Sequence, residues 1–326
     1  MRAHGNGEAY VRAAARTGTG RHAFLPGVLL RRNVRRGRVA LAVLLALGIL
    51  SGCATTSTSN EQPQHVLAVG STALQPLVSA AAQLYQQLHP QTKVEVQGGG
   101  GKSGLAAVTA HKSDIGDSDI YADPTEYPDP DLTDHLVCAV PFAMIMNPDV
   151  TVSSLTTDQI IAIFSTGAIT NWKAVGGPDI AIVPVVRPAT SGTRATFRKY
   201  VLGGRDENGK LLTTDSSETV RDTVANTPGA IGYVAVAYLN ASVRVVAIGG
   251  QLPTPENIST GRYAFWGFEH MYTIGDDTGA VGAFLDFMLT SQIQRLAQQL
   301  GYIPIAQMKL AGTGGRPVGE VSHEAA

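Results

Sequence analysis

The stretch Arg187-Pro-Ala-Thr-Ser-Gly-Thr-Arg194 stands between an apolar run at residues 180–186 and a helix-like run at residues 195–201. This order predicts a buried strand that ends in a short loop, from which a helix begins. The free backbone N–H groups of a helix N-terminus carry about half a positive charge between them, so such a loop attracts anions. The stretch therefore predicts an α/β fold with an anion-binding loop beyond a strand.

The residue types in this loop suit an oxyanion. Ser191 and Thr193 add hydroxyl donors, and Gly192 allows a ligand to approach the backbone closely. Arg187 presents a planar guanidinium that can donate to two oxyanion oxygens at once. An ordinary helix cap beside a surface arginine is the alternative, because Ser and Thr are preferred N-caps in any helix.

Upstream of this loop, short β-like runs alternate with helical runs. We expect strands and helices in turn at residues 66–69, 74–88, 93–97, 103–111 and 115–118. This alternation predicts a parallel sheet covered by helices, with ligand groups beyond the carboxyl ends of the strands. Downstream, the pattern predicts elements of a second lobe at residues 157–164, 180–186, 195–201, 218–226 and 231–236.

The folded part is long enough for two lobes with separate cores. The apolar run at 136–146 suits a crossing between them, and we expect hinges near 140–142 and 234–238. Residues 243–248 and a helix at 280–300 are expected to return to the first lobe. The predicted boundaries are 1–52 for a signal peptide with a lipobox, 53–64 for a flexible tether, 65–140 plus 236–311 for lobe 1, 141–235 for lobe 2 and 312–326 for a disordered tail.

The N-terminal segment indicates the compartment. A 12-residue apolar run at 39–50 follows an arginine-rich stretch and leads into Leu50-Ser-Gly-Cys53. A bilayer-spanning helix needs about 20 apolar residues, so this run fits the core of a signal peptide better than a membrane span. The Leu-Ser-Gly-Cys sequence looks like a bacterial lipobox, in which cleavage leaves Cys53 as a lipidated N-terminus. An ordinary secretory signal with an incidental cysteine, or an uncleaved anchor, is the alternative.

Charge and cysteine content exclude several classes. Residues 1–38 hold nine of the 25 basic residues and one of the 26 acidic ones, which leaves the rest with a net charge of about −9. An acidic protein is a poor candidate for nucleic acid, which is bound by clustered Lys and Arg. Any bound anion must therefore be held by local dipoles and hydrogen bonds. Once Cys53 is lipidated, Cys138 has no partner for a disulfide.

Two further loops repeat the chemistry of the 187–193 loop. Residues 70–73 read Gly-Ser-Thr-Ala after a predicted strand, and residues 98–104 read Gly-Gly-Gly-Gly-Lys-Ser-Gly before a predicted helix. The second loop imitates the end of a phosphate-binding P-loop, but Val96 stands where that motif needs its first glycine. The candidate ligands in these two loops are Ser71, Thr72, Ala73, Gly101, Lys102 and Ser103.

Asp119 closes the motif Ile115-Gly-Asp-Ser-Asp119. A carboxylate beside a bound anion is repulsive unless the ligand carries a proton to donate, and an unpaired buried charge costs several kcal/mol. Protonated phosphate can donate that hydrogen bond, whereas sulfate at neutral pH cannot, so such a carboxylate selects phosphate. A salt bridge, or a cap on the loop at 121–128, is the alternative role for Asp119.

Seven motifs occur together in one order. They are Gly-Ser-Thr at 70–72, the glycine-rich loop at 98–104, Ile-Gly-Asp-Ser-Asp at 115–119, Ile-Thr-Asn-Trp at 169–172, Arg-Pro-Ala-Thr-Ser-Gly-Thr at 187–193, Pro-Gly-Ala-Ile-Gly-Tyr-Val at 228–234 and Leu-Gly-Tyr-Ile-Pro at 300–304. This set closely resembles the phosphate-binding proteins of ABC-type phosphate importers over residues 66–305. The resemblance implies a two-lobed, periplasmic-binding-protein-like fold, each lobe a mixed sheet flanked by helices, with the ligand cleft between the lobes.

The resemblance also implies a ligand set. The positions that match the family's phosphate ligands are Thr72, Ala73, Asp119, Arg187, Ser191, Gly192 and Thr193, with Ser71 as an additional candidate. The family usually presents a serine where this chain has Gly101, so one hydroxyl donor is missing. Ser103, Lys102 or the backbone N–H groups of Gly101 and Lys102 could replace it.

The implied function is extracytoplasmic binding of inorganic phosphate and its delivery to the permease subunits of an ABC importer. The protein is expected to be a monomer that needs no cofactor or metal and reaches the membrane only through its lipid anchor. A binder of sulfate or molybdate and a phosphate sensor are the alternatives. A hydrolase would need a base for Ser191, but no Gly-x-Ser-x-Gly elbow surrounds that serine and no His/Asp/Glu cluster has metal-ligand spacing.

Overall fold

The computed structural model of the chain describes residues 63–209, 211–275 and 277–308. All of them belong to one compact unit. The predicted signal peptide, Cys53, nearly all of the predicted tether and the predicted tail lie outside the described residues. Within the described part, no helix is both long enough and apolar enough to cross a membrane.

The first half of the unit is built on a mixed sheet in the order β2-β1-β3-β10-β4. Its strands are β1 (Gln64–Gly70), β2 (Thr92–Gly98), β3 (Ile115–Ser118), β10 (Trp266–Ile274), β11 (Ile303–Pro304) and the start of β4 (Leu132–Met146). β1 pairs in parallel with β2 and β3, whereas β10 runs antiparallel to β3 and β4. Its helices are α1 (Gln75–Leu88), α2 (Gly101–Thr109), α7 (Gly279–Met288) and α8 (Ser291–Gln299).

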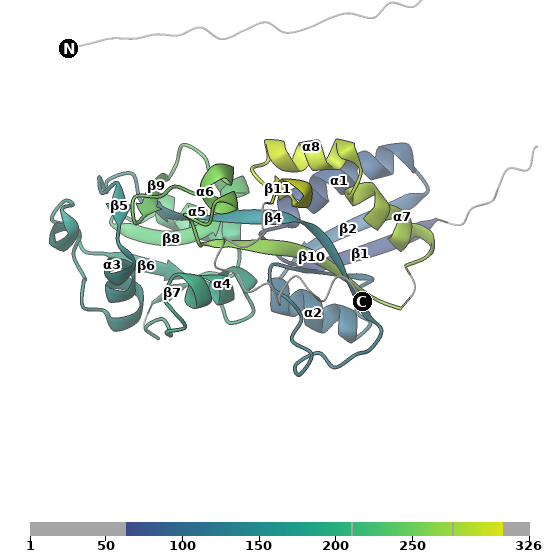
Figure 1. Cartoon of the computed structure of the whole chain (residues 1–326), viewed down its shortest axis with the longest axis horizontal. Coiled ribbons are helices and arrows are strands. Elements are labelled where there is room, and N and C mark those ends of the chain that lie inside the picture. The colour runs from purple at the N-terminus through teal and green to yellow at the C-terminus, as the bar shows by residue number, and fades with distance from the viewer. Residues whose placement is uncertain (1–62, 210, 276, 309–326) are drawn as a thin grey trace, which may run out of the picture. The chain divides into compact units, whose positions relative to one another are not determined.

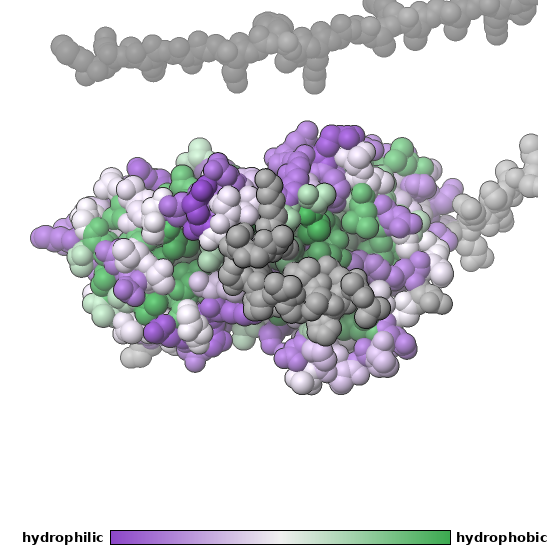
Figure 2. Space-filling model, viewed as in Figure 1, coloured by the Kyte–Doolittle hydropathy of each residue, from purple (hydrophilic) through white to green (hydrophobic). Residues whose placement is uncertain are grey.

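The helices of this half bury one apolar stripe each. In α1 the buried residues include Leu77, Ala81 and Tyr85, which recur at the four-residue spacing of one helix face. The Tyr85 ring packs against Phe284 of α7 at 5.4 Å between ring centroids. Figure 2 shows hydrophilic residues over the outer surface of α8, so the exposed face of this helix is polar whereas the buried faces are apolar.

The second half is built on β8 (Ala230–Ala235), with parallel β6 (Val183–Val186) beside it and β7 (Leu212–Thr213) beyond that. β9 (Arg244–Ile248) lies on the other side of β4 and pairs with β5 (Ser154–Leu155). The remaining elements of this half are α3 (Thr157–Ile161), a π-helical turn (Ala162–Thr166), two 3-10 turns (Trp172–Val175 and Val236–Tyr238), α4 (Gly192–Tyr200), α5 (Ser217–Asn226) and α6 (Pro255–Ser259).

One strand, β4, belongs to both halves (Figure 1). Residues 132–141 pair with β10, while Phe142–Met146 pair with β8. The prediction that the apolar run at 136–146 crosses between the lobes is therefore confirmed. The chain returns just before β10, where the Phe142 N–H donates to Phe265 O at 3.1 Å and the Tyr263 hydroxyl donates to Phe142 O at 2.7 Å.

Two predictions about the chain path are wrong. The return crossing does not lie at 234–238, and residues 243–248 do not rejoin the first lobe, because β9 pairs with β4 at Met144–Met146 and with β5. Only a short connection separates β8 from β9, and short connections keep consecutive strands in the same sheet.

The predicted helix at 280–300 is two helices, because Thr290 caps a new one by accepting from the Ile293 N–H.

Candidate anion-binding site

The first loop, at 70–73, is held close to the end of β3. Gly70 has a φ of 145°, and a Cβ there would lie 2.0 Å from the carbonyl oxygen of Asp117, so only glycine fits. The Ser71 hydroxyl accepts hydrogen bonds from the Ala73 and Leu74 N–H groups, both at 3.2 Å. The Thr72 hydroxyl instead reaches the other half, 3.0 Å from the Ser217 hydroxyl. Ser71 therefore shapes the loop, while Thr72 faces the site.

The second loop brings the start of α2 against Asp119. A Cβ on Gly101 would lie 2.7 Å from Asp119 Oδ1 and 2.9 Å from Ser118 Oγ, so the space that a serine would need is already filled. The Lys102 ammonium pairs with the Glu126 carboxylate at 2.9 Å. The backbone N–H of Lys102 donates to the carbonyl oxygen of Thr190 at 3.1 Å.

The expected replacements for the missing hydroxyl are thus largely unsupported. Both donors of Lys102, its ammonium and its N–H, are engaged elsewhere. No described hydrogen bond joins the Ser103 side chain to the other loops. The N–H of Gly101, the first residue of α2, remains the candidate donor from this loop.

The third loop places the N-terminus of α4 over Asp119. The helix begins at Gly192, and its N-cap Ser191 accepts from the Arg194 N–H at 3.2 Å. A Cβ on Gly192 would lie 2.0 Å from Asp119 Oδ1, so the backbone of this turn touches the carboxylate. The Thr193 hydroxyl donates to Asp119 Oδ2 at 2.7 Å. Because Gly192 and Thr193 lie in the first helical turn, their N–H groups are free of intrahelical partners.

Arg187 is a buried cation, with 1% of its surface exposed. Its guanidinium donates to the Ser217 hydroxyl at 3.2 Å, the Thr72 hydroxyl at 3.1 Å and the Asp215 carbonyl at 3.2 Å. Its Nε has no hydrogen-bond partner within the described residues. Burial lowers the pKa of the guanidinium, and the nearby charge of Asp119 raises it. A charged group surrounded by uncharged oxygens is incompletely compensated.

Asp119 faces the same space from the first half and is 3% exposed. Burial raises the pKa of its carboxyl, while the Thr193 hydrogen bond and then the charge of Arg187 lower it. Oδ1 has no hydrogen-bond partner among the described residues, although the backbones of Gly101 and Gly192 lie against it. The carboxylate is thus an unsatisfied acceptor that points into a site of N–H and hydroxyl donors.

Comparison with known proteins places this geometry in a family. The model described as the PBP superfamily domain matches residues 55–292. The phosphate-binding protein PstS of Bacillus subtilis is 43% identical over 244 residues, which cover 74% of this chain and 81% of that protein. The chain belongs to this phosphate-binding protein family.

Solved structures agree with this membership. A substrate-binding protein assigned to a phosphate ABC transporter of Clostridium perfringens, solved with bound phosphate, has a TM-score of 0.70 and 28% identity over 74% of this chain and 100% of its own. An ABC-type phosphate transport receptor from Vibrio cholerae has a TM-score of 0.60 and 28% identity over 73% and 99%. The predicted two-lobed, periplasmic-binding-protein-like fold is confirmed by these likenesses together with the observed sheets.

This family member has site residues that the sequence analysis missed. Ser217 is fully buried as the first residue of α5, and its hydroxyl contacts both Arg187 and Thr72. The Tyr238 hydroxyl donates to Thr72 O at 2.6 Å. The signal for Ser217 was present, because Asp215-Ser-Ser217 opens a helix with hydroxyl groups as the predicted loops do. Tyr238 carried no comparable signal.

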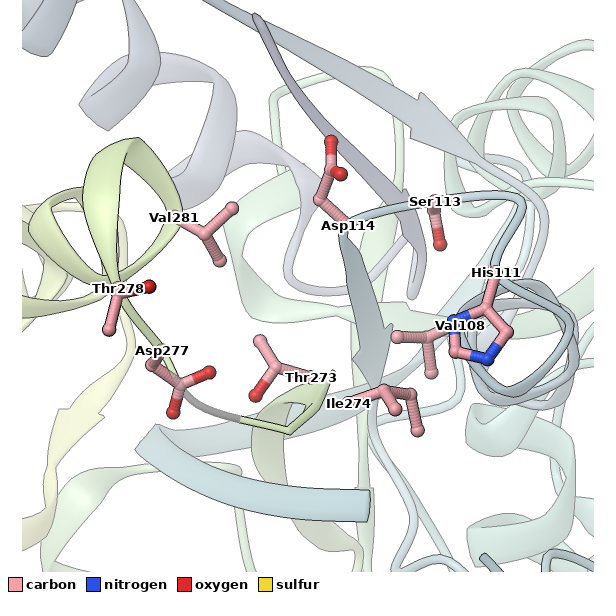
Figure 3. Close-up of a pocket in the computed structure, with 9 residues that line it drawn as sticks. All are labelled: Val108, His111, Ser113, Asp114, Thr273, Ile274, Asp277, Thr278 and Val281. Atoms are coloured by element: carbon pink, nitrogen blue, oxygen red, sulfur yellow. The ribbon is translucent and has the colours of Figure 1, made fainter. Parts of the chain in front are cut away.

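Another cavity lies away from these loops. It has a volume of about 210 Å³ and is found where β3 begins, opposite the end that carries Asp119. Figure 3 shows Val108 and His111 on one side of it and Asp277, Thr278 and Val281 on the other. Within the described ranges, no group of three or more His, Cys, Asp or Glu residues could hold a metal ion.

Proposed function

We propose that this protein binds inorganic phosphate outside the cytoplasm and delivers it to the permease subunits of an ABC-type phosphate importer. The observation that carries the proposal is Arg187, a buried guanidinium whose described hydrogen bonds all go to uncharged oxygens. A bound oxyanion compensates this charge through short, charge-assisted hydrogen bonds. The family relatives named as phosphate-binding proteins support the same ligand.

Asp119 is the residue that favours phosphate among the tetrahedral oxyanions. Its Oδ1 is a buried acceptor, so a ligand that brings a proton to this position forms a hydrogen bond. A fully ionised sulfate or molybdate would place an oxygen charge against the carboxylate instead, which costs binding energy. The proposed ligands around it are the Thr72 hydroxyl and the N–H groups of Gly101, Gly192 and Thr193.

A binding role is preferred to hydrolysis at this site. The Ser191 hydroxyl caps α4 by accepting from the Arg194 N–H, and no histidine forms a described hydrogen bond with it. An activated serine needs an adjacent base within hydrogen-bond reach. The relatives reported above carry the names of binding proteins and transport receptors, which supports a non-enzymatic role. We propose that the bound phosphate feeds transport rather than only a sensing pathway.

The proposed arrangement at the membrane rests on the N-terminal sequence. The mature chain would begin at Cys53 with a diacylglyceryl group, followed by the tether at 53–64, and would act as a monomer. Two or more acyl chains anchor a protein firmly, because each buried CH₂ contributes about 0.8 kcal/mol. We expect Cys53→Ala to release the protein or stall its processing. Mass spectrometry that found an unmodified Cys53 in membrane-extracted protein would contradict the anchor.

Isothermal titration with phosphate, sulfate and molybdate tests the binding proposal. The protein used would be the chain from residue 54 onward, which lacks the lipidated cysteine. We expect heat of binding with phosphate and much weaker or no binding with the two other anions. Tight sulfate or molybdate binding without phosphate binding would refute the assignment of the ligand. A phosphatase assay with a chromogenic ester, expected to give no turnover, tests the hydrolase alternative.

A further inference from the structure

Two backbone carbonyl groups of the first loop, those of Thr72 and Ala73, lie just before helix α1. In a continuous helical turn they would accept from the N–H groups of residues 76 and 77. Pro76 has no N–H to donate, and the Leu77 N–H donates to Leu74 O at 2.9 Å instead. Because Thr72 and Ala73 are buried, their carbonyl groups need donors from elsewhere in the protein.

Two tyrosine hydroxyl groups supply these donors. The Tyr238 hydroxyl donates to Thr72 O at 2.6 Å, and the Tyr302 hydroxyl donates to Ala73 O at 2.5 Å. Burial raises the pKa of both phenols, so each keeps the proton that it donates. Pro76 thus leaves a gap in the backbone hydrogen bonding of the loop, and the two tyrosines fill it.

The two tyrosines reach the loop from different halves. Tyr238 ends the 3-10 turn Val236–Tyr238 of the second half, whereas Tyr302 follows α8, which packs beside α1 in the first half (Figure 1). Gly301 has a φ of 89°, which turns the chain after α8, and a Cβ there would lie 2.9 Å from Val236 Cγ1. Because the backbone of Gly301 comes this close to Val236, the segments that carry the two hydroxyl groups pack against each other.

Thr72 is the loop residue through which these hydrogen bonds affect the site. Its side-chain hydroxyl lies 3.1 Å from a guanidinium nitrogen of Arg187 and 3.0 Å from the Ser217 hydroxyl. Its backbone carbonyl is fixed by Tyr238. A rotation of this peptide group would move the hydroxyl away from Arg187 and from the anion that we propose to bind there.

We propose that Tyr238 and Tyr302 are positioning residues for anion binding: by holding the carbonyl groups of the 70–73 loop, they keep the Thr72 hydroxyl directed at the ligand. The inference rests on the proposed phosphate function, and neither phenol is assigned a contact with the anion. It also gives a role to the motif at 300–304, whose glycine turns the chain after α8 and whose tyrosine then reaches the loop.

The test is the phosphate affinity of Tyr238→Phe and Tyr302→Phe, measured by calorimetry on the chain from residue 54 onward. Each variant keeps the ring and loses only the hydroxyl donor. We expect each to bind phosphate about three- to tenfold more weakly than wild type, as the loss of one hydrogen bond implies. Tyr263→Phe is the matched control, because it also removes a buried phenol that donates to a backbone carbonyl, Phe142 O, outside the three loops. We expect this control to bind within about twofold of wild type.

A double-mutant cycle tests whether the phenols act through Thr72. Thr72→Val removes the hydroxyl that they are proposed to position and keeps the branched shape of the side chain. Adding Tyr238→Phe or Tyr302→Phe to this variant should then weaken binding by less than about twofold further, because there is no hydroxyl left to misplace. Urea unfolding measures the stability of each variant separately, so a loss of packing is recognised by a lower midpoint without this non-additivity.

Three results would overturn the inference: unchanged affinity in the two tyrosine variants, equal losses with and without the Thr72 hydroxyl, or an equal loss in Tyr263→Phe. The last two would mean that the phenols contribute only to general packing. If Tyr302→Phe does not fold, the partly exposed Tyr238 provides the test alone. A wild-type chain that does not bind phosphate would refute the proposed function, and the inference with it.

Discussion

The two walls of the site carry opposite charge. The first half contributes the buried carboxyl of Asp119, whereas the second half contributes the buried guanidinium of Arg187. The hydrogen bonds from Arg187 to Thr72 and from Thr193 to Asp119 join these walls across the site. A ligand between them must therefore satisfy a cation on one side and an acceptor on the other. A fully ionised anion can compensate the charge of Arg187 but has no proton to donate to Asp119. The site therefore favours an anion that carries a proton.

Removing the positive wall should have the largest effect. We expect Arg187→Ala to weaken phosphate binding by about 1.5–3 kcal/mol or more, the range for charge-assisted hydrogen bonds. Calorimetric titration measures the change. Arg198→Ala is the matched control, because Arg198 pairs with Asp206 on the surface. Equal affinity in the two variants would mean that Arg187 does not bind the anion.

Changing the negative wall should alter selectivity rather than abolish the site. Asp119→Asn keeps the size of the side chain but can donate a hydrogen bond, so we expect phosphate binding to weaken by about 1–3 kcal/mol while sulfate binding improves. Competition between the two anions in one titration measures both changes. If this variant holds phosphate as tightly as wild type and still excludes sulfate, another residue makes the discrimination.

The packing of the second loop against Asp119 can be tested with a single added side chain. Gly101→Ser restores the residue usual in the family, but its Cβ would lie 2.7 Å from Asp119 Oδ1. We expect phosphate binding to weaken by about 1–2 kcal/mol, because the carboxylate or the start of α2 must shift. Gly209→Ser is the control, since a Cβ there would meet nothing within 4 Å. Tighter binding by Gly101→Ser would show that the site can make room for the missing hydroxyl.

The smallest effect is expected from Ser217, which connects the walls without a charge. Ser217→Ala removes the hydroxyl that contacts Arg187 and Thr72, so phosphate affinity should fall by about 0.5–1.5 kcal/mol. The exposed Ser242→Ala provides the comparison in the same titration. A loss as large as that of Arg187→Ala would indicate that Ser217 contacts the anion directly.

Local patterns in the sequence predicted the parts of the fold that depend on neighbours along the chain. The alternation of strands and helices from residue 66 to residue 118 reappears as β1, α1, β2, α2 and β3, with shifts of a few residues at the ends. The first two loops converge because β1 and β2 are parallel and end at the same edge of their sheet, whereas the third loop follows β6 in the other half and meets them across the site. The structure brings Thr72, Asp119, Arg187 and Thr193 together in this way.

What the sequence did not predict depends on contacts between distant residues. The pattern of residues 243–248 fits a strand of either sheet, and only the pairing with β4 and β5 decides between them. The side chain of Lys102 turns away because Glu126, far along the chain, offers a carboxylate at 2.9 Å. Ser217 resembles any helix cap until the fold sets it beside Arg187. These choices are made by tertiary packing, which short windows of sequence do not contain.

The path of β4 has a consequence for how the chain folds. Because its 15 residues complete both sheets, neither half possesses all of its own strands when the other is absent. A fragment cut between the halves would leave one sheet without its central strand and expose apolar surface. Although the molecule has two lobes, we expect its unfolding to be cooperative: a probe on α1 and a probe on α5 should lose structure in one transition at the same denaturant concentration.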